Sequence, residues 1–172
     1  PRTVVGTLFR NVDEKGNAGF QEGDYSKASL ASSDCLLFDP KYKKESGEDR
    51  LLFSSNYQNG LYQINLTQKY VKRLFNRSQY KSLHSFTFTA DGDTMLLPDD
   101  NGHGSDYTAP NIYYALRSEG FRKVRPYSYA PLTYALVSMK NGDKFYGTWT
   151  QATIYRMGNN KGKIPFVDDP AA

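Results

Sequence analysis

The chain has 172 residues, of which 38% are hydrophobic and 15% aromatic, and this supply of apolar side chains is enough for one globular β domain. Its net charge of +4 comes from scattered lysines and arginines, so the sequence lacks the continuous basic face that nucleic-acid binding needs. No apolar run approaches the roughly 20 residues of a membrane-spanning helix, and the single Cys35 excludes disulfides and cysteine-based zinc sites within the chain.

The N-terminal segment opens with a strand pattern that has no partners before it. Residues 3–10 (TVVGTLFR) alternate like a strand, so we expect the outermost strand of a blade whose other strands lie elsewhere. The chain starts at Pro1 and shows no signal peptide, which predicts a processed product or a fragment. Residues 11–33 are polar and rich in glycine, and their last part, 24–30, leads into the next strand.

A pattern of four strands then occurs three times along the chain. The first strands of the copies begin near Leu36, Phe86 and Ala135, which are 50 and then 49 residues apart. Asp91–Gly92 and Asn141–Gly142 supply tight hairpin turns after two of these strands, whereas the first copy has a charged insertion at 41–49. The remaining strands are predicted at 50–54, 61–62 and 70–75, at 94–97, 112–113 and 121–127, and at 144–148, 154–155 and 163–167.

A four-stranded unit at this period is typical of a β-propeller blade, since blade repeats run roughly 40–50 residues. A β-sandwich with coincidentally similar strands is the alternative. We therefore predict an all-β fold, a single partial propeller over residues 1–172 with four-stranded antiparallel blades. Its parts are an outer strand at 1–10 and blades at 31–76, 83–127 and 132–167.

Three blades and one strand do not make a complete propeller, because propellers have typically about 4–8 blades. We expect about half of a six-bladed ring. The remaining blades belong either to the same protein or to a second copy that pairs with this chain, and we favour the first alternative because an open arc would leave two blade faces bare.

The first copy also carries a family resemblance. The segment GNAGFQEGDYSKASLASSDCLLFDP, followed by RLLFSSNYQNGLYQINL, resembles an NHL repeat: a glycine-rich lead-in, an inner strand and a following hairpin. The chain is also similar to secreted proteins of gut Bacteroidetes in which an IPT/TIG immunoglobulin-like domain precedes an NHL-type propeller. The resemblance implies a secreted, periplasmic or cell-surface location, and some proteins of this type carry hydrolase or phosphatase labels.

Candidate functional residues gather in the loops at one end of the predicted blades, which we call the loop end. These loops join the second strand to the third within a blade, or one blade to the next. Aromatic rings beside carboxylates would suit a sugar or a peptide, although the same rings could simply pack between blades. The candidate ligand-binding residues are Tyr57, His84, Asp99, Asp100, His103, Tyr107, Tyr129 and Trp149.

Metal binding and catalysis have less support in the sequence. Asp99, Asp100, His103 and Asp106 offer oxygen and nitrogen donors within one loop, which could bind Ca²⁺ or another divalent ion, but they lack a recognised ligand spacing. No G-x-S-x-G nucleophile elbow occurs.

We therefore predict a recognition module without catalytic residues or a required cofactor, binding a glycan or a protein. The alternative is a propeller hydrolase, phosphatase- or lyase-like, that uses a divalent metal in its channel.

Overall fold

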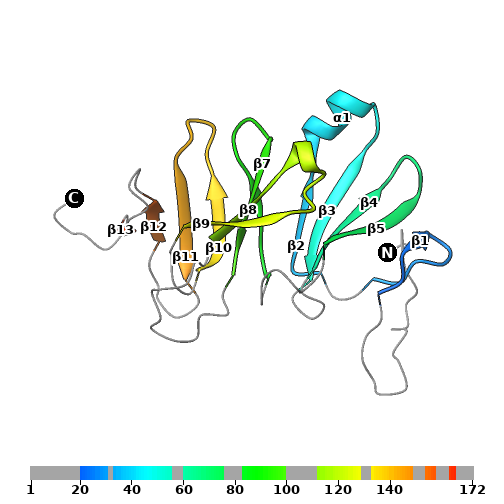
Figure 1. Cartoon of the computed structure of the whole chain (residues 1–172), viewed down its shortest axis with the longest axis horizontal. Helices are drawn as coiled ribbons and strands as arrows, with labels where there is room; N and C mark the ends of the chain where they lie inside the picture. Colours follow the sequence, from blue (N-terminus) through cyan, green and yellow to red (C-terminus); the bar gives the residue numbers. More distant parts are fainter. Residues whose placement is uncertain are drawn as a thin grey trace, which may run out of the picture. The chain divides into compact units, whose positions relative to one another are not determined.

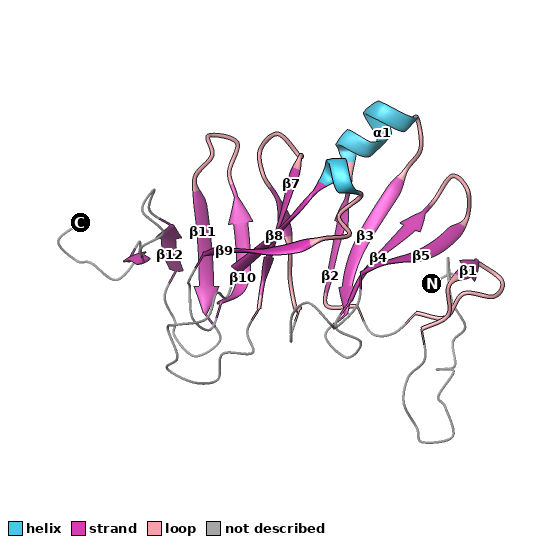
Figure 2. Ribbon diagram, viewed as in Figure 1, coloured by secondary structure: helices cyan, strands magenta, loops and turns pink. Residues whose placement is uncertain are grey.

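The computed structural model describes eight segments of the chain, and their regular structure is mostly β-strand (Figure 1, Figure 2). The strand pairs in each sheet are antiparallel. The chain divides into two compact units, residues 1–77 and residues 78–172. The described segments are residues 20–30, 33–55, 60–75, 83–99, 112–128, 133–148, 154–157 and 163–165.

The first unit contains a five-stranded sheet in the order β1-β5-β4-β3-β2. β1 (Gly23–Asp24) was not predicted as a strand, and it pairs with Val71 and Tyr70 on the outer edge of β5. The segment that reads as a polar lead-in therefore also extends the sheet. The other strands form the predicted meander and are β2 (Cys35–Phe38), β3 (Arg50–Ser55), β4 (Gly60–Asn65) and β5 (Tyr70–Phe75).

One face of this sheet is covered by the same lead-in segment. Tyr62 is fully buried, stacks on Phe53 with 5.0 Å between ring centroids, and contacts Phe20 of the lead-in at 4.5 Å. Gly60 is needed beside this ring, because a Cβ atom at position 60 would lie 2.6 Å from the Tyr62 hydroxyl oxygen. The core on this face comprises Ala28, Phe53, Tyr62, Ile64 and Val71.

The charged insertion after β2 contains a short helix, α1 (Pro40–Ser46), that the sequence reading did not predict (Figure 2). The Asp39 carboxylate accepts a hydrogen bond from the Tyr42 backbone N–H at 3.1 Å and caps the helix N-terminus, where Pro40 has no N–H and so needs no acceptor. Gly47 ends the helix with φ of +76°, a left-handed conformation that glycine adopts without strain. No helix among the described segments is long and apolar enough to cross a membrane.

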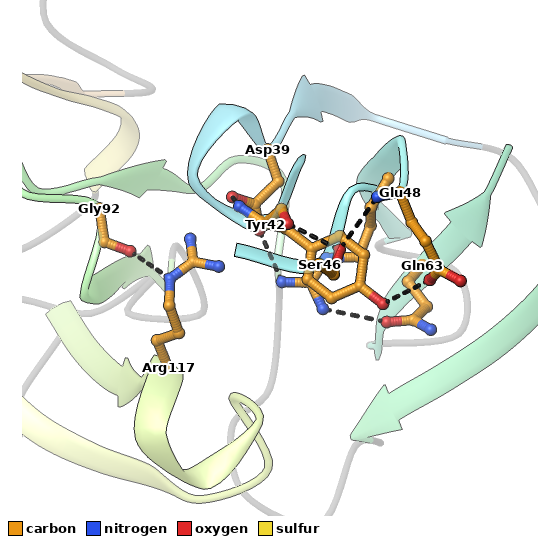
Figure 3. Close-up of polar contacts among 8 residues, drawn as sticks. Asp39, Tyr42, Ser46, Glu48, Gln63, Gly92 and Arg117 are labelled. Atoms are coloured by element: carbon orange, nitrogen blue, oxygen red, sulfur yellow. Dashed lines mark hydrogen bonds and ion pairs between the residues drawn. The ribbon is translucent and has the colours of Figure 1, made fainter. Parts of the chain in front are cut away.

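A buried ion pair holds α1 to the sheet (Figure 3). Arg50 on β3 is 6% exposed and Asp39 is fully buried, and their nitrogen and oxygen atoms lie 2.6 Å apart. The same guanidinium lies 3.8 Å from the centroid of the Tyr42 ring and donates to the Gln63 side chain at 3.2 Å. Because these contacts offset the cost of removing the charges from water, the pair can exist inside the fold.

Glu48 joins the helix, its following loop and the β4–β5 turn, and Figure 3 shows its contact with Tyr42 of the helix. Its carboxylate accepts hydrogen bonds from the Tyr42 hydroxyl at 3.0 Å, the Asn65 amide at 2.7 Å and the Gln68 amide at 2.5 Å. Donation from Asn65 and Gln68, and to a lesser extent from Tyr42, lowers the pKa of Glu48. This network is satisfied internally and gives the insertion a structural role.

The second unit contains two four-stranded sheets, each with its strands in sequence order. In both sheets the hairpin after the first strand turns at the predicted glycine, with φ of +72° at Gly92 and +90° at Gly142. The first sheet comprises β6 (Thr87–Phe88), β7 (Thr94–Pro98), β8 (Ile112–Leu116) and β9 (Val124–Ser128). The second comprises β10 (Thr133–Ser138), β11 (Lys144–Thr148), β12 (Ile154–Met157) and β13 (Lys163–Pro165).

Strand pairing shifts the alignment between the second and third copies of the repeat by one residue from the alignment that the sequence suggests. Phe88 pairs with Met95 and Ser138 pairs with Lys144, and each stands four residues before its turn glycine. Phe88 therefore corresponds to Ser138, and Leu136 rather than Ala135 corresponds to Phe86. The one-residue change matters, since it moves a side chain to the other face of a sheet.

In the β6–β9 sheet the fourth strand begins later than predicted, since the sequence analysis expects it to start at residue 121. The short 3₁₀ helix η1 (Arg117–Glu119) and Phe121, with φ of +60°, form the turn, and β9 begins at Val124. The Arg117 guanidinium donates to the Gly92 carbonyl oxygen at 2.7 Å, which ties η1 to the β6–β7 hairpin (Figure 3).

The two sheets of the second unit pack face to face. Leu96 and Ile112 of the first sheet are fully buried against Leu136, Tyr146 and Tyr155 of the second. The rings of Tyr146 and Tyr155 stack with their centroids 5.2 Å apart. This apolar contact is the kind of cover that a blade needs from its neighbour, since one sheet alone cannot bury both of its faces.

Candidate functional site

The loop end of the β6–β9 sheet brings together two of the predicted site residues, His84 and Asp99. Thr87 on β6 pairs with Leu96 on β7. The chain runs from His84 into β6 and from β7 out to Asp99, and because the two strands are antiparallel, His84 and Asp99 lie at the same end of the sheet. Residues 15 apart in the chain therefore meet at one end of a sheet because a hairpin folds them back.

His84 lies against an aromatic residue of the next sheet. Its imidazole stacks on the Tyr134 ring with 4.6 Å between centroids and 29° between planes. The neighbouring Ser85 hydroxyl donates to the Tyr134 carbonyl oxygen at 2.8 Å. One contact aligns the rings and the other fixes the backbone, so the β6 and β10 segments present a composite aromatic surface at this end.

Asp99 supplies a carboxylate that is only 6% exposed. Burial raises the pKa of the Tyr113 phenol on β8, and the negative charge of Asp99 raises that pKa further. The phenol therefore stays protonated and remains a hydrogen-bond donor at neutral pH. His84, Tyr134, Asp99 and Tyr113 together form what we call the loop-end cluster.

The loop-end cluster contains the kinds of group that ligand binding uses. Aromatic rings offer flat apolar faces, while a carboxylate and a phenol offer directional hydrogen bonds. Among the described residues no group of three or more His, Cys, Asp and Glu side chains is arranged to hold a metal ion. The loop with Asp100, His103 and Asp106, the other proposed metal ligands, lies outside those residues.

Most predicted site residues fall outside the described segments. Of the eight candidates only His84 and Asp99 are described. The other candidates are Tyr57, Asp100, His103, Tyr107, Tyr129 and Trp149.

The sequence reading missed Tyr134 and Tyr113 as site residues, although signals for both were present. Tyr134 stands 50 residues after His84, which is the repeat distance between corresponding positions of the two sheets. Tyr113 belongs to the range 112–113, which the sequence predicts only as a third strand. The position of Tyr113 near Asp99 depends on the β7–β8 pairing, in which Tyr113 faces Leu97.

Comparison with known proteins identifies the class of fold. No protein-family model and no curated protein matches the chain. Among solved structures, an auxiliary nutrient binding protein from Bacteroides thetaiotaomicron VPI-5482 matches with a TM-score of 0.74 at 19% identity, over 95% of this chain and 36% of that one. An auxiliary nutrient binding protein from Bacteroides ovatus ATCC 8483 gives 0.66 at 20% identity, over 94% of this chain and 36% of that one.

An enzyme is also similar in structure. Virginiamycin B lyase from Staphylococcus aureus matches with a TM-score of 0.53 at 14% identity, over 92% of this chain and 48% of that one. These likenesses, together with the antiparallel sheets, define the class of fold: the chain is a partial all-β propeller. It spans about a third of the length of each nutrient binding protein.

Proposed function

We propose that the chain is a non-enzymatic recognition module that binds a glycan or a protein through its loop end. The observation that carries this proposal is the stacked pair of His84 and Tyr134 at the end of the sheet that also holds the buried Asp99. A flat aromatic surface beside hydrogen-bonding groups suits the apolar face and hydroxyls of a sugar, or a peptide. The likeness to two nutrient binding proteins supports a binding role.

The wider setting is part of the same proposal. We infer one partial propeller domain over residues 1–172, of NHL type, in a secreted, periplasmic or cell-surface protein of the IPT/TIG–NHL kind. Its likeness to Bacteroides nutrient binding proteins supports a role outside the cytoplasm. The loop residues Tyr57, Tyr107, Tyr129 and Trp149 are proposed to extend the aromatic surface, with Asp100 and His103 as polar partners.

An array of neutral and acidic oligosaccharides, together with a peptide array, tests the binding role. His84→Ala, Trp149→Ala and Tyr57→Ala are expected to weaken capture of whichever probe binds the unmodified chain. Tyr70→Ala is the matched control, because Tyr70 is a half-buried tyrosine at the opposite end of its sheet, beside the β4–β5 turn. If all three loop-end variants bind as well as the unmodified chain, the loop end is not the binding surface.

A second candidate function is a hydrolase or lyase that uses a divalent metal. It is favoured by one observation, that the antiparallel β6–β7 pair places the imidazole of His84 and the carboxylate of Asp99 at the same end of one sheet, and by the likeness to a lyase. Asp100 and His103 would then complete the donor set. Elemental analysis of the purified chain separates the two functions, since a divalent ion bound in stoichiometric amount and lost in His84→Ala and Asp99→Asn would favour the enzyme.

A further inference from the structure

Charge is distributed unevenly between the two ends of the sheets in the second unit. We call the end with the hairpins at Gly92 and Gly142 the turn end, and it lies opposite the loop end because each strand runs from one to the other. The lysines and arginines that the structure describes in this unit lie in turn-end connections or within two strand residues of them. They are Arg117, Arg122, Lys123, Arg125, Lys140, Lys144, Arg156 and Lys163.

The connections that leave the strands at the loop end have the opposite composition. Residues 99–111, 129–132 and 149–153 join strands there, and they contain three aspartates and no lysine or arginine. The segment that leads into β6, residues 78–86, contains one lysine, Lys81. Acidic residues therefore outnumber lysine and arginine at this end, although the whole chain has a net charge of +4.

Asp99 is the aspartate of these connections that belongs to the described segments. It directly follows β7, and it is 6% exposed. Burial raises the pKa of the Tyr113 phenol and the negative charge of Asp99 raises it further, so the carboxylate and the phenol lie near each other. Since charges interact more strongly in the low dielectric of a buried site than in water, a cationic group of a ligand would be attracted here.

The stacked rings of His84 and Tyr134 lie at the same end as this carboxylate. His84 leads into β6 and Asp99 follows β7, and these are adjacent strands, which lie about 4.7–4.9 Å apart. Two rings with centroids 4.6 Å apart make a wider apolar surface than one ring does. Such a surface suits a sugar ring, and aromatic faces also attract cations.

A buried hydroxyl group at the loop end is also available for hydrogen bonding. Ser128 ends β9 and pairs with Ile112, which in turn pairs with Pro98, the residue before Asp99. The Ser128 side chain is 1% exposed, and its hydroxyl oxygen has no hydrogen-bond partner in the described structure. Because an unsatisfied buried hydroxyl costs free energy, a ligand hydroxyl or an ordered water at this end would be stabilising.

We propose that the loop end binds a glycan built from hexosamine units with free amino groups, with the protonated amine paired to Asp99 and the sugar ring on the His84–Tyr134 surface. The proposal rests on the binding role proposed above and names the charge class of the ligand. Uronic acids and sulfated sugars would be rejected, because their negative charge meets the acidic loop end.

The position of the amine favours a sugar over a lysine-containing peptide. An amine bonded directly to a pyranose ring can reach the carboxylate while the ring stays on the aromatic surface. A lysine ammonium stands on a flexible four-carbon stem and can reach the carboxylate without using that surface. The combination of carboxylate and aromatic surface is therefore used fully by the amino sugar alone.

Calorimetric titration with four oligomers of equal length tests the proposal, in slightly acidic buffer that keeps the amines protonated. The probes are oligomers of glucosamine, N-acetylglucosamine, galacturonic acid and lysine. The glucosamine oligomer is expected to bind the unmodified chain most tightly. Acetylation keeps the ring and removes the charge, and oligolysine keeps the charge and removes the ring, so each should bind about tenfold more weakly. The galacturonic acid oligomer should not bind.

Matched variants assign the preference to Asp99. Asp99→Asn should abolish the preference for the glucosamine oligomer over its acetylated form. Asp93→Asn makes the same change at the turn end of β7, where Asp93 is exposed, and should keep the preference. His84→Ala should weaken binding of both sugars. Added salt should weaken binding of the glucosamine oligomer but not of the acetylated one, which gives a readout that needs no variant.

The outcomes separate this inference from the proposed recognition role. Equal binding of the amino and acetylated sugars, or a preference that survives Asp99→Asn, would overturn the charge class. Oligolysine bound as tightly as the glucosamine oligomer, or no binding of the glucosamine oligomer, would overturn the assignment to an amino sugar. In each case, capture of another probe that is weakened by His84→Ala would leave the recognition role standing. Binding that is unaffected by His84→Ala would instead contradict the loop end as the binding surface.

Discussion

The imidazole of His84 stacks on the phenol ring of Tyr134 with 4.6 Å between their centroids. These residues stand 50 positions apart, at corresponding places before or at the start of the first strands of two sheets. The Ser85 hydroxyl fixes the same junction by donating to the Tyr134 carbonyl oxygen. The contact therefore links the two sheets at their loop end and at the same time creates the surface on which binding is proposed.

A double-mutant cycle on His84 and Tyr134 should give a measurable coupling energy. We expect the double variant to lose less stability than the sum of the losses in His84→Ala and Tyr134→Ala. The difference should be roughly 0.5–1 kcal/mol, because either change alone removes the stacking. Urea unfolding measures the free energies. Tyr134→Phe keeps the ring and should preserve the coupling, so equal losses from Phe and Ala would contradict a role for stacking.

The buried ion pair of Asp39 and Arg50 should be costly to break from one side. Arg50→Met is expected to destabilise the first unit by about 3–5 kcal/mol, since it leaves the fully buried Asp39 carboxylate without its 2.6 Å partner.

The double variant Asp39→Asn with Arg50→Met removes both charges and keeps an oxygen that can cap α1. It should therefore lose clearly less stability than Arg50→Met alone. Urea unfolding monitored by far-ultraviolet circular dichroism provides the comparison, and an equal loss in both variants would mean that the charge of Asp39 is not the source of the cost.

Removal of the Tyr146 hydroxyl should stabilise the protein or leave it unchanged. Tyr146 is 2% exposed, and its hydroxyl oxygen has no hydrogen-bond partner in the described structure. Burial raises the pKa of this phenol, with a smaller contribution from Tyr155. Tyr146→Phe keeps the packing and removes an unsatisfied polar group, a change worth up to about 1 kcal/mol.

The matched comparison is Tyr25→Phe. The Tyr25 hydroxyl donates to the Asn65 carbonyl oxygen at 3.2 Å, so its removal should cost about 0.5–1.5 kcal/mol. In thermal unfolding, Tyr25→Phe should therefore have a lower melting temperature than the unmodified chain. Tyr146→Phe should have a higher or an unchanged one. A clear loss of stability in Tyr146→Phe would show that its hydroxyl has a partner in solution.

The stabilising effect of Glu48 should depend on pH in the acid range. Its pKa is lowered by donors from Asn65 and Gln68, so the folded state prefers the charged carboxylate. The stabilisation is fully present above the ordinary glutamate value of 4.5 and is lost as the pH falls through the lowered folded-state pKa. Glu48→Gln should melt at a lower temperature than the unmodified chain at pH 7.

That difference between Glu48→Gln and the unmodified chain should shrink as the pH falls below 4.5. Glu45→Gln is the control, because Glu45 lies exposed on the same helix. A melting-temperature difference that stays constant between pH 7 and the acid range would rule out the charge of Glu48 as its cause.

The sequence predicted the strands well where short-range chemistry decides them. Alternation and the glycines at positions 92 and 142 located the hairpins of the second unit, because a tight turn and a period of two are local properties. Helix α1 was missed since seven residues of mixed charge carry no helical periodicity, and its stability comes from Asp39 and Arg50, which are 11 positions apart.

The candidate site was only partly predictable for the same reason. His84 and Asp99 were selected as loop residues, and the β6–β7 register brings them to one end of a sheet. Tyr134 was overlooked, because its role depends on which residue of the next sheet meets His84. A repeat alignment shifted by one residue could not identify that partner.

The amino-acid sequence by itself determined the repeating strands, their turns and the all-β class, because each depends on side chains only a few positions apart. Tertiary structure alone decided which face of each sheet is covered. Ile112 and Ile154 open equivalent strands in sequence, yet one is fully buried and the other is half exposed. Burial depends on a neighbouring sheet that packs against the residue, and strand periodicity carries no information about that neighbour.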